Sequence, residues 1–147
     1  MLHPEELTVG SLVITNKGDV IKVESISTKR QHRKVGYHTP NDPYRIKYVR
    51  LAQCSGIALT NEFFEKNGFA RRDYEFPHTL PHVFDIRTKD GCHVRVFDKV
   101  NYHTIIIWGT FVNRNRNYYK GCVNTVHDFQ SKLRSNGLYD LANNLKV

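Results

Sequence analysis

Short runs of hydrophobic residues that alternate with polar residues dominate the chain, and this two-residue period indicates β-strands. Residues 12–15 and 20–26 are two such runs, and they flank a turn at residues 16–19. Gly18 supplies the positive φ that a tight turn of this kind needs. We therefore expect the chain to open with an antiparallel hairpin.

A second hairpin is the clearest local prediction. Residues 83–88 and 92–97 are both rich in β-forming side chains, and the Asp-Gly pair between them is a strong turn signal. Residues 102–112 are β-branched and aromatic, which is typical of a central buried strand. Residues 45–51 alternate between basic and bulky side chains, so we expect a strand with one wetted face.

Two helices are indicated by the residues at their ends. Thr60 is a suitable N-cap for a short helix that ends at Gly68, because glycine tolerates the left-handed conformation after a helix. Thr125 and Gly137 delimit a second helix in the same way, and Asp128 lies where its charge favours the positive end of the helix. The hydrophobic stripe of this helix consists of Val126, Phe129 and Leu133. We expect this stripe to pack in the core.

These elements predict an α+β fold with a curved antiparallel sheet and two short helices. The strand-rich opening, with Gly10 and Gly18, resembles a small SH3-like β-barrel. A chain of 147 residues suits one compact core. We therefore expect residues 1–147 to form a single domain.

Three stretches, residues 7–26, 57–69 and 126–141, carry a combined pattern over about a third of the chain. The pattern is a Leu-x-x-Gly β opening, a Leu-Thr-x-Glu helix that ends in Gly-Phe, and a Val-His-x-Phe-Gln helix. It resembles a family of small proteins, without an assigned activity, that is common in Bacteroides-type bacteria and their phages. The resemblance implies a phage-associated protein. Its motifs imply folding roles and carry over no catalytic residue.

The remaining composition restricts the class of protein. Residues 1–7 contain no apolar signal core, and the apolar stretch 104–112 is far shorter than the roughly 20 residues of a membrane span. We expect a location in the cytoplasm of a bacterial host cell. The three cysteines have no C-x-x-C spacing and the eight histidines are scattered, so we expect reduced thiols, no metal site and no cofactor.

Charge is the best functional clue. The net charge is +8, and residues 29–50 hold seven basic side chains against one acidic one, a local excess of +6. Tyrosines are interleaved with these charges, and residues 113–121 repeat the mixture of Arg, Asn and Tyr. Such side chains grip phosphates and stack on bases. We therefore predict that the protein binds a phosphate-bearing ligand, either a nucleic acid or a nucleotide, without forming a covalent bond to it.

The predicted ligand-binding residues fall in two sets. The first set is Arg30, Arg33, Lys34, Tyr37, Arg45 and Lys47. The second set is Arg114, Arg116 and Tyr118. Replacing Arg33, Lys34 and Lys47 together by Ala should weaken binding sharply and leave the fold intact. The competing interpretation is that both basic runs are solvated faces that keep the protein in solution.

Three other functions remain open. The protein is a phage accessory factor that sequesters a nucleotide signal or a host protein, a structural or virion protein, or a metal-independent nuclease. The sequence has no Gly-rich phosphate loop and no nucleophile or zinc-protease motif, so a nuclease would rely on side chains brought together by adjacent strands. The residues suited to that role are His93, Arg95, Tyr102 and His103. An exposed edge strand also makes a homodimer plausible.

Overall fold

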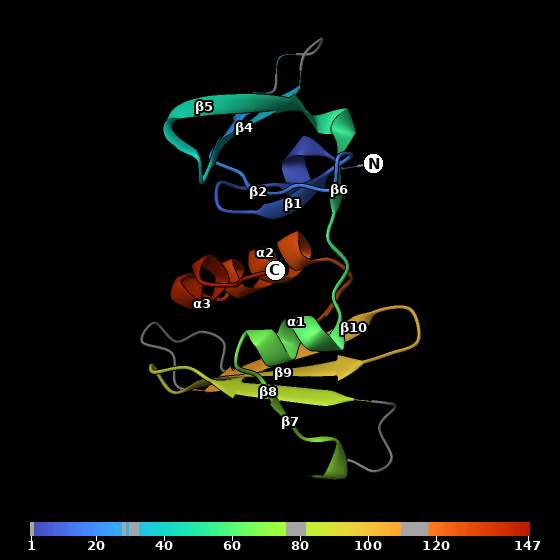
Figure 1. Cartoon of the computed structure of the whole chain (residues 1–147). Helices are drawn as coiled ribbons and strands as arrows, with labels where there is room; N and C mark the ends of the chain where they lie inside the picture. Colours follow the sequence, from blue (N-terminus) through green and yellow to red (C-terminus); the bar gives the residue numbers. More distant parts are fainter. Residues whose placement is uncertain (1, 28, 30–32, 76–81, 110–117) are drawn as a thin grey trace. The chain divides into compact units, whose positions relative to one another are not determined.

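The computed structural model describes residues 2–27, 29, 33–75, 82–109 and 118–147. It has a mixed α+β fold in which antiparallel sheets combine with three short α-helices among these residues. The chain groups into two compact units, colored along the sequence in Figure 1: Met1–Ala58 with Thr125–Arg134, and Leu59–Asn124 with Ser135–Val147. The expectation of a single domain stays a prediction.

The first unit contains two three-stranded antiparallel sheets. One has the order β2-β1-β6, from β1 (Leu12–Thr15), β2 (Val20–Lys22) and β6 (Cys54–Gly56). The other has the order β3-β4-β5, from β3 (Ser25–Ser27), β4 (Lys34–Thr39) and β5 (Asp42–Arg50). Two short 3₁₀ turns complete the unit, Pro4–Glu6 and Leu51–Gln53. The strands of this unit form no closed barrel within the described residues.

The predicted opening hairpin is confirmed, with one change. β1 pairs with β2 across a turn in which Gly18 has φ +87°. The single strand expected over residues 20–26 is divided, because β2 ends at Lys22 and β3 begins at Ser25 in the other sheet. Val23, which lies between them, is fully buried. The chain therefore changes sheets at this point while its apolar side chains stay in one core.

Helix α2 (Val126–Ser135) is joined to the opening of the chain. Its predicted stripe of Val126, Phe129 and Leu133 is fully buried. Gln130 is also buried, and its side chain accepts a hydrogen bond from Leu12 N (2.9 Å) and donates one to Gly10 O (3.1 Å). Because a buried amide must find such partners, the Val-His-x-Phe-Gln segment and the Leu-x-x-Gly segment act together in folding.

The second unit is built on one antiparallel sheet with the strand order β11-β10-β9-β8-β7. Its strands are β7 (Ala70–Arg71), β8 (Val83–Arg87), β9 (Cys92–Asp98), β10 (His103–Gly109) and β11 (Tyr118–Val123). The second predicted hairpin is confirmed as β8 and β9, with Gly91 at φ +84° in the turn. The strand expected over residues 102–112 is β10, which lies between β9 and β11. Residues 110–112 lie outside the described residues.

Two helices cover one face of this sheet. Helix α1 (Asn61–Lys66) begins at Thr60, whose hydroxyl accepts from Phe63 N at 3.2 Å, as predicted. The Phe64 ring stacks on Phe84 of β8, with ring centroids 5.3 Å apart. Helix α3 (Tyr139–Asn143), which the sequence did not predict, lies on the same side of the sheet as α1 (Figure 1). A 3₁₀ turn, Asp73–Glu75, follows β7. No helix among the described residues is long and apolar enough to cross a membrane.

Candidate functional site

Residues 34–50 of the basic segment form the β4–β5 hairpin of the first unit, and the charges of this hairpin are divided between two faces. Tyr37 lies directly opposite Lys47, and Val35 opposite Val49. Opposite residues in an antiparallel pair share a face, and the buried Val35 shows that this face packs on the core. Lys34 lies on the other face, which it shares with its partner Arg50.

The predicted first set of residues is therefore only partly gathered. The structure brings Tyr37 and Lys47 together, but the strand register shifts between Tyr37 and Thr39, and Arg45 lies opposite this irregularity without a paired residue. It places Lys34 on the opposite face, and Arg33 lies just before β4. Arg30 of this set and Arg114 and Arg116 of the second set lie outside the described residues. Nothing in the fold tests whether these residues bind a ligand, so the assignment stays a prediction.

A different arrangement occurs on the sheet of the second unit. Strand register aligns one residue from each of four neighbouring strands in a row, and this row is Arg87, His93, Trp108 and Tyr118. The next row along the strands is Asp85, Arg95, Ile106 and Lys120. We call the sheet face that these two rows form the open face.

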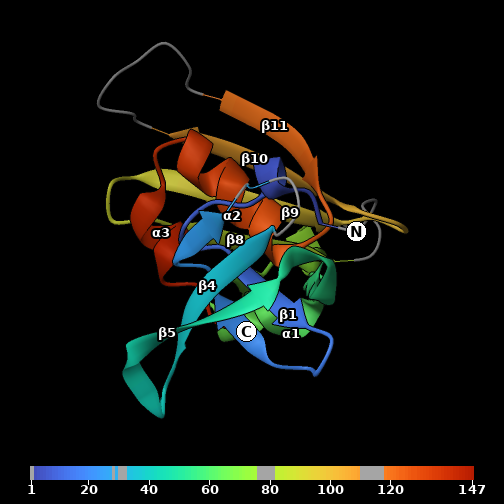
Figure 2. The same ribbon diagram turned by 90° about the horizontal axis from the view of Figure 1, so that it is seen from above.

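The open face lies on the side of the sheet away from α1. The residues that alternate with its two rows on β9 and β10 are fully buried, and they are Val94, Val96, Ile105 and Ile107. Phe84 of β8, which pairs with Val96 on that buried side, stacks on Phe64 of α1. Figure 2 shows β11, which carries Tyr118 and Lys120, beside β10. Both of these side chains and Arg87 are exposed, while His93, Arg95 and Trp108 are half-buried.

Three side chains in the middle of the open face are fixed against one another. The His93 and Trp108 rings are stacked, with centroids 5.0 Å apart and planes 7° from parallel. The guanidinium carbon of Arg95 lies 5.0 Å from the centroid of the Trp108 ring, a cation–π contact. Asp85 holds the same guanidinium through a 2.6 Å ion pair. Contacts within the protein therefore hold His93, Arg95 and Trp108 in place without a ligand.

A cavity of about 610 Å³ opens over this cluster. Besides Gly68, Ala70 and Ile86 it is lined by three arginines, two carboxylates and two aromatic rings, from Arg72, Arg87, Arg95, Glu75, Asp85, His93 and Trp108. Arg72 bonds Glu75 at 2.9 Å. Hydrogen bonds to Tyr74 and then to Glu75 raise the pKa of Arg72 above its usual value, so it stays a full cation. The lining therefore combines a positive excess with a flat aromatic surface.

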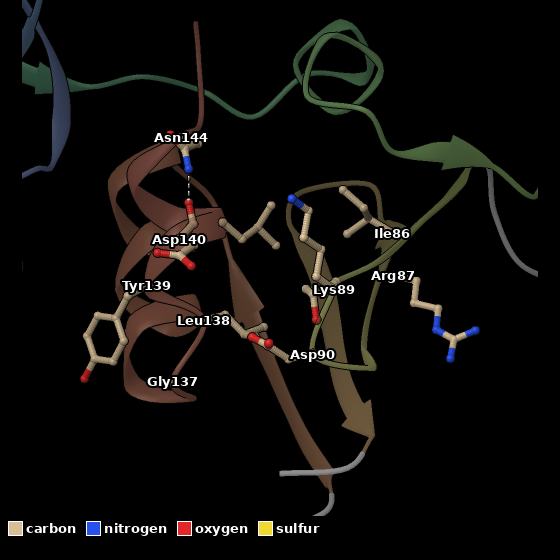
Figure 3. Close-up of a pocket in the computed structure, with 11 residues that line it drawn as sticks. Ile86, Arg87, Lys89, Asp90, Gly137, Leu138, Tyr139, Asp140 and Asn144 are labelled. Carbon is tan, nitrogen blue, oxygen red and sulfur yellow. Dashed lines mark hydrogen bonds between the residues drawn. The ribbon is translucent and has the colours of Figure 1, made fainter. Parts of the chain in front are cut away.

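A second cavity, of about 570 Å³, lies between the β8–β9 turn and α3. Figure 3 shows Arg87 and Tyr139 directed away from it on opposite sides. The charged side chains that remain around it include Lys89 with Asp90 and Asp140, so cations are not in excess there. This cavity is less suited to an anion than the one over the open face.

The four side chains considered for a metal-independent nuclease do not converge. His93 and Arg95 lie on the open face, but His103 pairs with Asp98 on the opposite face and is buried. Burial lowers the pKa of His103, an effect that the charge of Asp98 partly offsets. Tyr102 precedes β10 and is exposed. Within the described ranges there is also no group of three or more His, Cys, Asp or Glu placed to hold a metal ion.

Comparisons of the chain with protein-family models, curated proteins and solved structures give no match. The candidate site therefore depends on the geometry of this chain alone.

Sequence reasoning missed Arg72, Arg87 and Trp108 as site residues. Trp108 was expected in a buried strand, but its register with His93 places it on the open face, half-buried. A usable signal was present in the two strands of the second hairpin, where polar residues alternate with apolar ones and so share one face. Tyr118 was predicted, and the structure places it beside Trp108 in the same row.

Proposed function

We propose that the protein binds a phosphate-bearing ligand, a nucleic acid or a nucleotide, on the open face of its five-stranded sheet. The observation that carries the proposal is the His93–Trp108 ring stack with the Arg95 guanidinium over it, inside a cavity that Arg72 and Arg87 also line. No bond to the ligand needs to form or break in this function.

The chemistry of these groups favours such a ligand over a simple anion. An arginine fork donates two parallel hydrogen bonds to a phosphate, and Arg87 is exposed and available for this contact. A base adds to the His93–Trp108 pair as a further ring, which is worth about 1–3 kcal/mol per base. Because Asp85 already fixes Arg95, little side-chain freedom is lost when the ligand arrives.

The basic hairpin of the first unit is a second candidate for the same chemistry. Tyr37 and Lys47 lie together on one face of this hairpin. Arg45 precedes Lys47 by two residues on β5, opposite the point where the strand register shifts. We keep the prediction that Arg33, Lys34 and Lys47 contribute to binding as a separate proposal, because the variants of one surface can be tested without the other.

Three further proposals concern the fold of the first unit, the origin of the protein and the form that binding takes. We propose that the strand-rich opening of the first unit is an open relative of a small SH3-like barrel, supported by its β1–β2 hairpin and by positive φ at Gly10 and Gly18. We propose a phage-associated protein that acts in the bacterial cytoplasm, as the resemblance of its three motif stretches implies. A phage protein that holds a nucleotide in one deep pocket could sequester a nucleotide signal of the host, and this is one form that the proposed binding function could take.

Fluorescence anisotropy tests the proposal. Labelled single-stranded DNA, single-stranded RNA, duplex DNA and a labelled nucleotide are titrated with the full chain over a salt series. We expect at least one probe to bind, with an affinity that falls as salt rises. Arg87→Ala should weaken that binding about tenfold, the value of one charge-assisted hydrogen bond.

Lys89→Ala is the matched control, because Lys89 lines the second cavity and not the first, whereas Arg87 lines both. We expect this variant to bind like the unmodified protein. The proposal fails if none of the probes binds, or if Arg87→Ala binds them as tightly as the unmodified protein does.

A further inference from the structure

We infer that the ligand of the open face is a single strand of nucleic acid that crosses strands β8 to β11, with its bases over His93, Trp108 and Tyr118 and with Arg87 free for a phosphate at the β8 end of the row. This inference rests on the proposed function and specifies the class of the ligand and its path. It extends beyond the cavity to strand β11, since Tyr118 and Lys120 lie outside the cavity lining.

The first argument is the length of the row. Four strands separated by about 4.8 Å each give a row of roughly 14 Å. The cavity lies over the β8–β10 part of this row, and the exposed Tyr118 continues it by one strand. A mononucleotide that occupies the cavity would leave Tyr118 unused. A strand of several nucleotides would occupy the whole row.

The second argument is the separation of ring and charge into parallel rows. Three of the four members of the first row are aromatic. In the second row Arg95 and Lys120 are cationic and Asp85, which pairs with Arg95, is anionic, so a positive charge remains at Lys120. The two rows are two residues apart along each strand, about 7 Å. A nucleic-acid strand has the same division, with bases along one side and phosphates along the other. The face therefore offers stacking surfaces and phosphate contacts in matching order.

The third argument concerns duplexes. A duplex keeps its bases stacked inside, and a protein reads them only with an element that enters a groove. The aromatic rings of the open face lie on the surface of a five-stranded sheet, and Trp108 is half-buried there, so they cannot reach into a groove. Only unpaired bases can be stacked on these rings. We therefore assign a single strand as the ligand. Either DNA or RNA would serve, because the bases of both have a flat face that can stack on an aromatic ring.

A length series tests this inference. Labelled thymidine oligonucleotides of one, two, four, six and eight nucleotides are titrated with the full chain, together with an eight-base-pair duplex. We expect affinity to rise with length until the row is filled and then to level off, and the duplex to bind at least tenfold more weakly than the longest single strand. Affinity that is the same for one and eight nucleotides, or that is higher for the duplex, overturns the inference.

Tyr118→Ala localises the effect. We expect it to weaken binding of the eight-nucleotide strand about tenfold and to leave binding of the mononucleotide unchanged. The matched control is Tyr139→Ala, because Tyr139 on α3 is exposed to the same degree, 59% against 57% for Tyr118. Lys120→Gln should reduce the slope of log affinity against log salt by about 0.7, the share of one phosphate contact in a single strand.

The outcomes separate this inference from the function it rests on. If the mononucleotide binds and Arg87→Ala weakens it, but neither length nor Tyr118→Ala matters, then the path across the sheet is wrong and the proposed function stands. If no oligonucleotide and no nucleotide binds, both are wrong.

Discussion

Two sheets of this protein carry basic and aromatic residues, and they use them differently. In the β3–β4–β5 sheet of the first unit, cations lie on both faces, with Lys47 on one and Lys34 and Arg50 on the other. In the five-stranded sheet of the second unit, strand register gathers arginines and rings on one face, because Val94, Val96, Ile105 and Ile107 fill the middle of the opposite face. The comparison teaches that a ligand surface follows from which residues share a face, and the number of charges in a segment does not determine it.

The difference has a packing cause. In the middle of β9 and β10 the fully buried Val94, Val96, Ile105 and Ile107 alternate with the residues of the open face, so polar residues at those alternate positions have only the open face available. On β5 the residues from Pro43 to Tyr48 are all exposed, so no apolar face forces its charges to one side. Ile46 and Tyr48 of β5 are exposed although they are large and hydrophobic. Both side chains lie close to the backbone of Gly36, where an added Cβ would stand 3.1 Å from each of them.

The largest expected effect separates the two sheets directly. Combining Arg87→Ala with Trp108→Ala should weaken binding of single-stranded DNA about 100-fold, because one stacked base and one charge-assisted hydrogen bond are both lost. The measurement is fluorescence anisotropy at one salt concentration. Circular dichroism and a urea titration must show that the double variant is folded.

The triple variant Arg33→Ala, Lys34→Ala and Lys47→Ala supplies the other half of that comparison. It removes three charges, against one in the double variant. If the open face holds the ligand, we expect the triple variant to lose less than about tenfold, through the long-range attraction of its charges. A larger loss in the triple variant than in the double variant would assign the ligand to the first unit.

A second prediction compares the Arg95–Asp85 ion pair of the second unit with the hydrogen bond between Glu24 and His38 in the first unit. The Arg95–Asp85 pair is largely shielded, with side chains 22% and 12% exposed, whereas Glu24 and His38 in the first unit form a pair that is 38% and 27% exposed. Asp85→Asn should lower the free energy of unfolding by about 2 kcal/mol, since it leaves Arg95 without its carboxylate. Glu24→Gln should change it by less than about 0.5 kcal/mol.

Urea titration at pH 7 measures both variants. Equal effects would contradict the expectation that the shielded Arg95–Asp85 pair contributes more to the free energy of unfolding than the contact between Glu24 and His38 does.

The smallest expected effect concerns one buried histidine in each unit. Burial lowers the pKa of His103 in the second unit and of His127 in the first, and neighbouring carboxylates, Asp98 for the former and Asp128 and Glu6 for the latter, only partly offset this. The unfolded chain then takes up protons near pH 6.5, before the folded chain does. The stability contributed by the neutral histidines is therefore complete above pH 6.5 and is lost as the pH falls below it.

Urea midpoints at pH 7.5 and pH 5.5 check this direction. We expect a lower midpoint at pH 5.5, and a smaller difference in His103→Gln and in His127→Gln than in the unmodified protein. Stability that rises on acidification, or a difference that neither substitution reduces, would contradict the assignment.

Local structure was largely predictable from the sequence. The two turn glycines, the N-cap Thr60 and the stripe on α2 were predicted and confirmed, because each depends on residues that are close together in the chain. The short helix α3 was missed. Its N-cap position is Leu138, whose side chain accepts no capping hydrogen bond, so no capping residue marks its start.

The candidate site was less predictable, since it depends on strand register. Trp108 and His93 are 15 positions apart and belong to different strands, and only the pairing of β9 with β10 makes them neighbours. From the sequence, basic residues were chosen as candidate ligand contacts where they are concentrated along the chain. This criterion selected residues 29–50. Arg72, Arg87 and Arg95 are too widely spaced to form such a run, although the cavity brings them together.

The fluorescence of Trp108 tests the central claim most directly, because it is the only tryptophan of the chain and it lies in the middle of the open face. Single-stranded DNA is titrated into the full chain, and tryptophan emission and the anisotropy of the labelled strand are recorded together. The proposal predicts quenching of Trp108 with the same midpoint as the anisotropy change, since a base stacks on the His93–Trp108 pair. An anisotropy change with unaltered tryptophan emission would show that the strand binds elsewhere, and would contradict it.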